Sequence, residues 1–233
     1  MWAKRLRRGE KPMTANLGVI FDVDGVLVDS YQAHYEAWVL MGRQRGFTIT
    51  EEMFAISFGR TSREAIVDVF GLTTLTPEEI AELDLTKEAV YRELLADSFP
   101  ELDGASELID ALHAANFKLG VGSSGPPGNV DLAVDKLRRR DKFSGIITGR
   151  DVTRGKPDPQ VFLYAAQRMG VEPRHCCVLE DAPPGIAAAH AAGMKCIAVT
   201  STGRTRAEQS AADKIVASLR EVTPEMVRKL ITG

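Results

Sequence analysis

Beyond Leu102 the chain alternates short apolar runs with longer segments in which apolar residues recur at helical spacing. The runs predict strands at residues 117–122, 145–148, 176–179, 196–200 and 215–216, and the segments predict helices at 105–116, 129–140, 159–170 and 184–192. Strands that alternate with helices form a parallel sheet with helices on both faces. The sequence therefore predicts an α/β fold with a doubly wound parallel sheet, to which an earlier apolar run at 18–21 adds a strand.

The segment from 31 to 101 differs, because it has helical periodicity and no convincing strand pattern. We expect helices at 31–45, 63–70 and 77–96. The last begins cleanly, with Thr76 as N-cap and Pro77 in the first turn. The chain is therefore expected to have a core domain formed by residues 17–30 and 102–233, interrupted by an all-helical cap domain at 31–101.

Composition sets few further limits on function. The 233-residue chain is 44% hydrophobic and 26% charged, and its net charge of -3 offers no general attraction to nucleic acid or to an anionic membrane. No apolar run has the length of a membrane span, and three cysteines without metal spacing argue against a disulfide framework. We expect a cytoplasmic monomer or weak homodimer, without nucleic-acid or membrane partners, whose residues 1–16 form a basic, disordered extension.

Two carboxylates follow the first predicted strand. Asp22 and Asp24 end the apolar run at 18–21 and are separated by one residue. Side chains at positions i and i+2 of a strand point the same way, and the carboxyl ends of parallel strands form the ligand-binding edge of an open α/β sheet. Two buried like charges are costly unless a cation or a shared proton relieves them. This edge is therefore expected to carry chemistry.

Polar residues also follow the other predicted strands. Ser123, Ser124 and Gly125 follow the second strand, Lys156 lies in the connection after the third, and Glu180 and Asp181 follow the fourth. Carboxylate oxygens are ligands of Mg²⁺, which usually also takes oxygens of a substrate phosphate. A serine hydroxyl, backbone N–H groups and a lysine bind phosphate oxygens. The set as a whole suits a phosphoryl group together with Mg²⁺.

Four segments, in this order, resemble the motifs of the haloacid dehalogenase superfamily. They are Asp22-Val23-Asp24-Gly25, Ser123 after a strand, Gly155-Lys156-Pro157-Asp158, and Glu180-Asp181-Ala182-Pro183-Pro184-Gly185. A helical insertion directly after the first motif is similar to the branch that holds β-phosphoglucomutase and many sugar-phosphate and phosphoglycolate phosphatases. The resemblance covers residues 18–219 and implies a Rossmann-like core with a helical cap.

The resemblance implies a division of roles among these residues. Asp22 matches the nucleophile that forms an aspartyl-phosphate, and Asp24 matches the general acid/base. Mg²⁺ would be held by the Asp22 carboxylate, the Asp24 backbone carbonyl and Asp181, with Glu180 helping through water or from behind the direct ligands. Ser123 and Lys156 would hold the transferred phosphoryl group. We expect Asp22, beside a cation, to stay ionised and Asp24 to be able to hold a proton.

The resemblance implies a small phosphorylated metabolite as substrate, but it leaves the phosphoryl acceptor open between water and a second sugar hydroxyl. The loop 58–64 resembles the substrate-specificity loop of the family, so that Arg60 or Arg63 could hold a distal phosphate or carboxylate. The predicted substrate-binding residues are Ser30, His34, Arg60, Arg63, Lys87, Ser124 and Gly125.

Sequence details favour a phosphatase and keep a phosphosugar mutase as the alternative. Ser30, His34 and Lys87 match residues that mutases carry at these places. Phe58 and Pro126, in contrast, stand where β-phosphoglucomutases usually carry lysine. A phosphatase that depends on Mg²⁺ and hydrolyses a compound such as a sugar phosphate is therefore the expected function.

One other class of protein has a literal motif in the chain. The segment from Gly120 to Gly125 matches the dinucleotide-binding pattern G-x-G-x-x-G after a strand. However, Gly120 lies inside the predicted strand, Pro126 and Pro127 interrupt the start of the next helix, and no acidic residue ends the next strand. A dinucleotide oxidoreductase is therefore a remote alternative. A binding module without catalysis is also disfavoured, because no motif position is lost.

Overall fold

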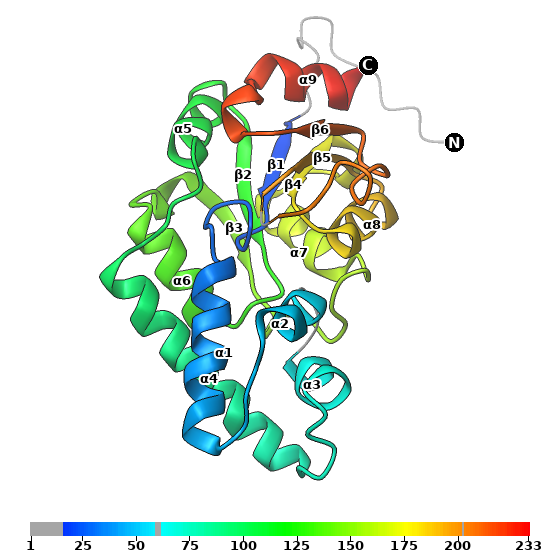
Figure 1. The fold of residues 1–233 in the computed structure, drawn as a ribbon. Coiled ribbons are helices and arrows are strands. Elements are labelled where there is room, and N and C mark those ends of the chain that lie inside the picture. The colour runs from blue at the N-terminus through cyan, green and yellow to red at the C-terminus, as the bar shows by residue number, and fades with distance from the viewer. Residues whose placement is uncertain (1–15, 59–61, 202) are drawn as a thin grey trace, which may run out of the picture.

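One parallel sheet of six strands, in the order β3-β2-β1-β4-β5-β6, forms the centre of the part of the chain that the structure describes (Figure 1). The structure is a computed structural model and describes residues 16–58, 62–201 and 203–233. The strands are β1 (Gly18–Phe21), β2 (Lys118–Gly122), β3 (Phe143–Ile147), β4 (Cys176–Glu180), β5 (Lys195–Val199) and β6 (Lys214–Val216). This order is that of a doubly wound sheet, so the predicted fold class is confirmed.

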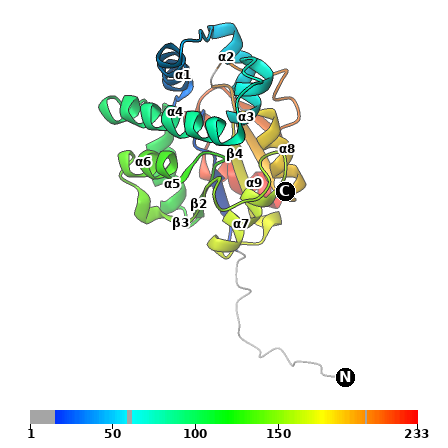
Figure 2. The ribbon, with the colours of Figure 1, turned by 90° about the horizontal axis from the view of Figure 1, so that it is seen from below.

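Helices cover both faces of the sheet (Figure 2). The helices α5 (Ala105–Ala114), α6 (Pro127–Lys136) and α9 (Pro224–Thr232) pack on one face, against side chains such as Val19 and Phe21. The helices α7 (Gln160–Met169) and α8 (Pro183–Ala191) pack on the other face, against Ile20. Side chains of a strand alternate between faces, so a continuously apolar strand such as β1 is buried on both sides.

Four helical segments lie between β1 and α5. They are α1 (Tyr31–Arg45), α2 (Glu51–Ser57), α3 (Ser62–Glu64), which continues as the π-helical turn η1 (Ala65–Val69), and α4 (Pro77–Asp97). These segments, called the cap helices below, enclose an apolar cluster of their own around Trp38, Met41, Phe54 and Ile66. The domain boundaries at 31 and 101 stay a prediction, which this separate cluster supports.

The predicted elements agree with the structure to within a few residues, with some exceptions. The helices α2 and α9 were not predicted, and the single helix expected at 63–70 is divided between α3 and η1. Pro126 and Pro127 do not interrupt α6, since Pro126 is its N-cap and Pro127 is its first residue. Proline is tolerated at the first helical position because the backbone N–H that it lacks would have no partner inside the helix there. Short 3-10 turns at Arg140–Lys142, Pro173–His175 and Leu219–Glu221 complete the described structure.

Two other expectations concern the N-terminal extension and the absence of membrane-spanning segments. The predicted basic extension at 1–16 lies almost entirely outside the described residues, which begin at 16. Among the helices that the structure describes, none combines the length and the apolar character needed to cross a membrane.

Candidate active site

The carboxyl end of β1 brings the first motif to the edge of the sheet. The Asp22 N–H donates to the Leu179 carbonyl at 3.0 Å, which extends the pairing of β1 with β4 by one residue. The chain then turns at Gly25, whose φ of 74° is a backbone conformation that residues other than glycine rarely adopt. A Cβ atom at Gly25 would also lie 2.5 Å from Asp181 Oδ2. Glycine therefore lets the first motif approach the fourth.

Three buried carboxylates and one lysine meet at this edge. Oxygens of Asp22, Glu180 and Asp181 lie within 4.8 Å of one another. The Lys156 ammonium lies 2.9 Å from Asp22 Oδ1 and 2.6 Å from Glu180 Oε1. Burial lowers the pKa of Lys156, but the charges of Asp22 and Glu180 raise it more, so the lysine stays a cation. The structure thus brings together four of the residues predicted from separate strand ends.

Glu180 holds Lys156 and the start of the following turn. Its side chain is fully buried, and Oε2 accepts hydrogen bonds from the Asp181 and Ala182 N–H groups, both at 2.8 Å. Oε1 is occupied by Lys156. Since both oxygens have partners, the geometry supports the prediction that Glu180 acts from behind the direct metal ligands.

The donor set fits a divalent cation. Burial raises the pKa of Asp22 well above its ordinary value, because the attraction of Lys156 is outweighed by burial and by the neighbouring carboxylates of Glu180 and Asp181. A cation held by the Asp22 and Asp181 carboxylates, with Glu180 behind them, would relieve this excess of negative charge and keep Asp22 ionised. All three residues offer oxygen, which hard cations prefer.

Asp24 points away from this cluster, toward the cap helices. Its Oδ1 accepts a hydrogen bond from the Tyr91 hydroxyl of α4 at 3.2 Å and lies 3.3 Å from His34 Nε2 of α1. Burial raises the pKa of Asp24, but the hydrogen bond and charge of His34, with Ser30 and Lys87, lower it more, to well below its ordinary value. From the protein's own groups alone, the pKa of Asp24 thus lies below its ordinary value and that of Asp22 above it, whereas the expectation for the cation-bound site stays a prediction.

A chain of polar contacts extends from Asp24 through the cap helices to the core. His34 Nδ1 lies 2.8 Å from Lys87 Nζ, which lies 2.7 Å from Glu88 Oε1. Glu88 Oε2 accepts from Asn129 Nδ2 of α6 at 2.5 Å. His34 and Lys87 were predicted to be near the substrate. Sequence analysis did not single out Glu88 or Asn129, because a buried contact between two helices leaves no local pattern.

The second motif forms a turn beside Asp24. The Ser123 N–H donates to the Ile147 carbonyl at 3.1 Å, and its hydroxyl accepts from the Gly125 N–H at 3.0 Å. A Cβ atom at Gly125 would lie 3.8 Å from Asp24 Oδ2, so the turn lies near the acid/base candidate. Ser124 is exposed. The roles of these residues toward phosphate stay predictions.

The structure does not test the role predicted for the two arginines of the loop 58–64. Arg60 lies outside the described residues, and Arg63 is exposed on α3. Their role toward substrate therefore stays a prediction.

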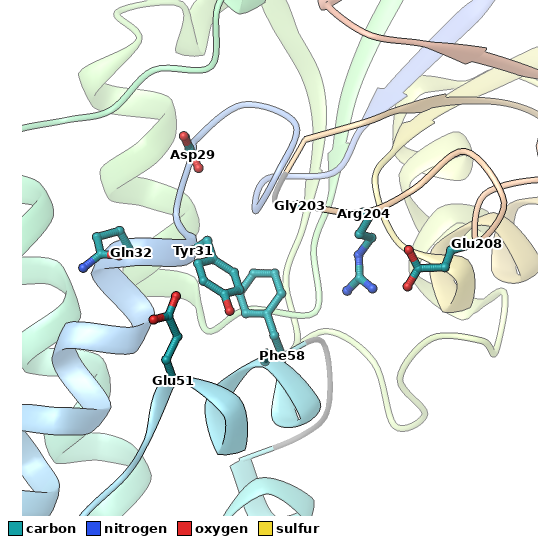
Figure 3. A pocket seen from close by; sticks show the side chains of 9 residues that line it. Asp29, Tyr31, Gln32, Glu51, Phe58, Gly203, Arg204 and Glu208 are labelled. Atoms are coloured by element: carbon teal, nitrogen blue, oxygen red, sulfur yellow. The ribbon is translucent and has the colours of Figure 1, made fainter.

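A pocket of about 620 Å³ lies next to the acidic cluster, between the cap helices and the loop after β5 (Figure 3). The described residues that line it are Asp29, Tyr31, Gln32, Glu51, Ala55, Phe58, Gly203, Arg204 and Glu208. Arg204 Nε lies 3.5 Å from Asp181 Oδ2, which connects the pocket to the acidic cluster. Apart from Phe58, sequence reasoning singled out none of these residues for the site. Tyr31, Gln32, Glu51 and Ala55 lie on the helices α1 and α2, whose docking on the core leaves no local pattern, and Gly203, Arg204 and Glu208 lie in a segment without periodicity.

The glycines of the G-x-G-x-x-G pattern have a packing role instead. A Cβ atom at Gly120 would lie 2.7 Å from Met169 Sδ, and one at Gly122 would lie 2.9 Å from the ring of Phe162. Both contacts are with α7, so these glycines let the helix pack closely against β2. The pattern therefore needs no dinucleotide to explain it.

Comparisons with known proteins agree with this geometry. Residues 17–193 match the model of a hydrolase family described as haloacid dehalogenase-like hydrolase. The chain is 34% identical over 204 residues to validoxylamine A 7'-phosphate phosphatase of Streptomyces hygroscopicus subsp. limoneus, covering 87% of this chain and 94% of that protein. It is also 34% identical over 187 residues to beta-phosphoglucomutase of Bacillus subtilis (strain 168), covering 78% and 82%.

A solved structure resembles the whole described fold. The crystal structure of a HAD hydrolase, family IA, variant 3, from Entamoeba histolytica HM-1:IMSS has a TM-score of 0.84 and 28% sequence identity, and the match covers 93% of this chain and 100% of that one. The chain belongs to the haloacid dehalogenase-like hydrolase family, which confirms the resemblance found in its motifs. It is a phosphatase of that family, a hydrolase of phosphoric monoesters.

Proposed function

We propose that the chain is a Mg²⁺-dependent phosphatase that hydrolyses a small phosphorylated metabolite, such as a sugar phosphate, through an aspartyl-phosphate on Asp22. The observation that carries this proposal is the position of the Lys156 ammonium, 2.9 Å from Asp22 and 2.6 Å from the buried Glu180. A cation fixed beside a carboxylate can hold a phosphate oxygen next to the attacking atom. Relatives named hexitol phosphatase A and fructose-1-phosphate phosphatase YqaB, both of Escherichia coli (strain K12), support this substrate class.

The first step transfers the phosphoryl group to the protein. A carboxylate oxygen of Asp22 attacks phosphorus, the bond between phosphorus and the leaving oxygen breaks, and Asp24 gives that oxygen a proton. The low pKa of Asp24 opposes its protonation. A phosphate dianion bound nearby would raise that pKa by charge repulsion.

The second step returns the protein to its starting state. Water attacks phosphorus of the aspartyl-phosphate, the bond to Asp22 breaks, and Asp24 takes the proton of the water. Its contacts with His34 and Tyr91 hold the Asp24 carboxylate in the ionised form that a base needs. Bound Mg²⁺ would be held by the Asp22 and Asp181 carboxylates and the Asp24 carbonyl, and would offset the charge of the phosphoryl group.

Phosphate release from a panel of phosphomonoesters, with and without Mg²⁺, tests the proposal. The purified chain should release phosphate from sugar phosphates and from p-nitrophenyl phosphate, and EDTA should stop the reaction. Fluoride complexes that imitate a phosphoryl group should be trapped at the Asp22 side chain in the Mg²⁺-loaded protein. A well-folded protein that bound Mg²⁺ but left Asp22 free of such a complex would contradict the covalent mechanism.

A phosphosugar mutase is the second candidate. The close contact of His34 with Lys87, at 2.8 Å, and the link of His34 to Asp24 support it, because mutases carry these residue types at the matching places. The similarity to a beta-phosphoglucomutase supports it as well. Following the conversion of β-glucose 1-phosphate to glucose 6-phosphate beside phosphate release separates the two, since a mutase transfers the phosphoryl group to a sugar rather than to water.

A further inference from the structure

A second cation approaches the acidic cluster from the segment after β5. Arg204 Nε lies 3.5 Å from Asp181 Oδ2, and the side chains of the two residues are 18% and 5% exposed. Lys156, in contrast, contacts the carboxylates of Asp22 and Glu180. The two cations thus approach different carboxylates, and Arg204 faces one of the two that are proposed to hold Mg²⁺.

The backbone on both sides of Arg204 is fixed to the site. The fully buried Gln209 donates from Nε2 to the Asp181 carbonyl at 2.7 Å and to the Val199 carbonyl at 2.8 Å. The Ser201 hydroxyl donates to the Gly25 carbonyl of the first motif. The position of Arg204 beside Asp181 is therefore set by the docking of this segment on the first and fourth motifs, and does not depend on the strength of the ion pair itself.

The contact of Arg204 with Asp181 is loose. Arg204 Nε is buried but has no hydrogen-bond partner among the described residues, and arginines that bind a carboxylate firmly typically donate two hydrogen bonds to it. The guanidinium carbon lies 5.9 Å from the centre of the Phe58 ring, and Glu208, whose carboxylate also feels the charge of Arg204, lies on its other side (Figure 3). The guanidinium can therefore shift away from Asp181 and still have an aromatic ring and a carboxylate nearby.

The charge of Arg204 has a direct consequence for a metal ion. The guanidinium offsets part of the negative charge of the buried carboxylates, which are costly to bury without a cation. A divalent cation held by Asp22 and Asp181 would offset the same charge and would repel the guanidinium. The two cations would therefore compete, and the metal would bind less tightly than it would beside a neutral side chain.

We infer that Arg204 is a counter-ion of Asp181 that competes with the metal ion for this carboxylate, so that its charge sets the affinity of the chain for Mg²⁺. The inference rests on the proposed function, from which it takes the Mg²⁺ site, and it adds a residue outside the four motifs that regulates that site. Removing the positive charge at position 204 should tighten Mg²⁺ binding, whereas a residue that merely supported the fold of the site would weaken it when replaced.

Mg²⁺ binding can be measured without turnover. The thermal unfolding temperature is followed at neutral pH as Mg²⁺ is raised from about 0.1 to about 30 mM, and the concentration dependence gives an apparent Kd even where binding is weak. Arg204→Met removes the charge and keeps an unbranched side chain, and it should lower this Kd about tenfold. Arg204→Lys keeps the charge and should stay within about threefold of the wild type.

Arg206→Met is the matched control. Arg206 lies two residues further along the same segment, is exposed, and donates from Nη1 to the Ile215 carbonyl at 3.2 Å. Its replacement removes the same charge from the segment at a place without a described contact with Asp181, so the Kd for Mg²⁺ should change by no more than about twofold. Each variant keeps all other charges of the chain, so the comparison isolates the charge at position 204.

The outcomes distinguish this inference from the proposed function. Mg²⁺ binding that is unchanged or weaker in Arg204→Met would overturn the inference, and so would equal tightening in Arg204→Met and in either Arg206→Met or Arg204→Lys. A wild-type unfolding temperature that does not respond to Mg²⁺ would overturn both the inference and the proposed Mg²⁺ site. Tightening in Arg204→Met alone, in a chain that releases no phosphate from any phosphomonoester, would support the inference and overturn the proposed reaction.

Discussion

Gly185 lies directly against the carboxylate of Glu180. A Cβ atom at position 185 would lie 1.7 Å from Glu180 Oε1 and 2.0 Å from its carboxyl carbon. The first turn of α8 therefore packs on the buried side chain that holds Lys156 beside Asp22. The conformation of Glu180 depends on the absence of a side chain at this helix position.

Gly185→Ala should therefore reduce both stability and activity. Glu180 cannot move without losing its contacts with Lys156 and with two backbone N–H groups. Overpacking of this kind costs about 1–3 kcal/mol in the free energy of unfolding. We expect kcat for p-nitrophenyl phosphate to fall at least about tenfold, because Lys156 loses its position. Urea unfolding and steady-state kinetics measure the two effects.

Gly155→Ala is the control for this substitution. Position 155 is next to Lys156 in the chain, but a Cβ atom there would have no described heavy atom within 4 Å. This variant should keep nearly all of the stability and kcat. A Gly185→Ala protein with the wild-type kcat would show that the orientation of Glu180 does not matter for turnover.

The convergence of Asp22, Lys156, Glu180 and Asp181 could be predicted because it follows from topology. Each residue comes at or after the carboxyl end of a strand, and a parallel sheet brings those ends to one edge. Strand positions were predictable as well, since strands buried on both faces read as continuous apolar runs. The order of the elements thus predicts that Lys156 lies at the same edge as the carboxylates, whereas its contacts with Asp22 and Glu180 were not predicted.

The surroundings of Asp24 could not be predicted in the same way. Its partners Tyr91 and His34 lie on the cap helices, and their distance from Asp24 depends on how those helices dock on the core. No local pattern encodes that docking. The hydrogen bond and charge of His34, with Ser30 and Lys87, lower the pKa of Asp24, an effect that the sequence did not predict. Arg204 was missed because it lies in an aperiodic loop.

The two motif aspartates should respond differently to amidation. Asp22→Asn should abolish turnover, because an amide is a poor nucleophile, and should weaken Mg²⁺ binding through loss of a carboxylate ligand. Asp24→Asn should lower kcat by about 100-fold or more while Mg²⁺ binding persists, because its side chain points toward Tyr91 and His34 rather than into the carboxylate cluster. Calorimetric Mg²⁺ titration and phosphate release separate these effects. Full activity of Asp24→Asn would exclude its acid/base role.

Asn129 and Glu88 should be energetically coupled. Glu88 is 8% exposed and Asn129 is 4% exposed, and their hydrogen bond of 2.5 Å joins cap helix α4 to α6 of the core. Hydrogen bonds to buried charged groups contribute about 1.5–3 kcal/mol. A double-mutant cycle with Asn129→Ala and Glu88→Ala, measured by urea unfolding, should give a coupling energy of about 1 kcal/mol or more. Additive effects of the two substitutions would mean that this contact does not stabilise the docking of the cap helices.

Asp110 should contribute stability that is lost in acid. The Arg139 guanidinium donates to both of its oxygens, at 3.0 and 2.7 Å, and Lys142 also binds it. These hydrogen bonds, that of Arg139 first, outweigh partial burial and lower the pKa of Asp110 from 3.8 to about 2. Because the folded-state pKa is the lower one, the contribution is complete above about pH 4 and disappears as the pH falls through 2.

Asp110→Asn should therefore lower the free energy of unfolding at pH 7, by less than about 1 kcal/mol because the ion pair is partly exposed to solvent. Its difference from the wild type should shrink as the pH falls from 4 toward 2. Urea unfolding at a series of pH values measures this. Asp141→Asn, at an exposed residue with no ion pair to the described residues, should change the free energy at pH 7 by no more than about 0.5 kcal/mol. A difference between Asp110→Asn and the wild type that stayed constant down to pH 2 would show that Asp110 stabilises the fold by packing rather than by charge.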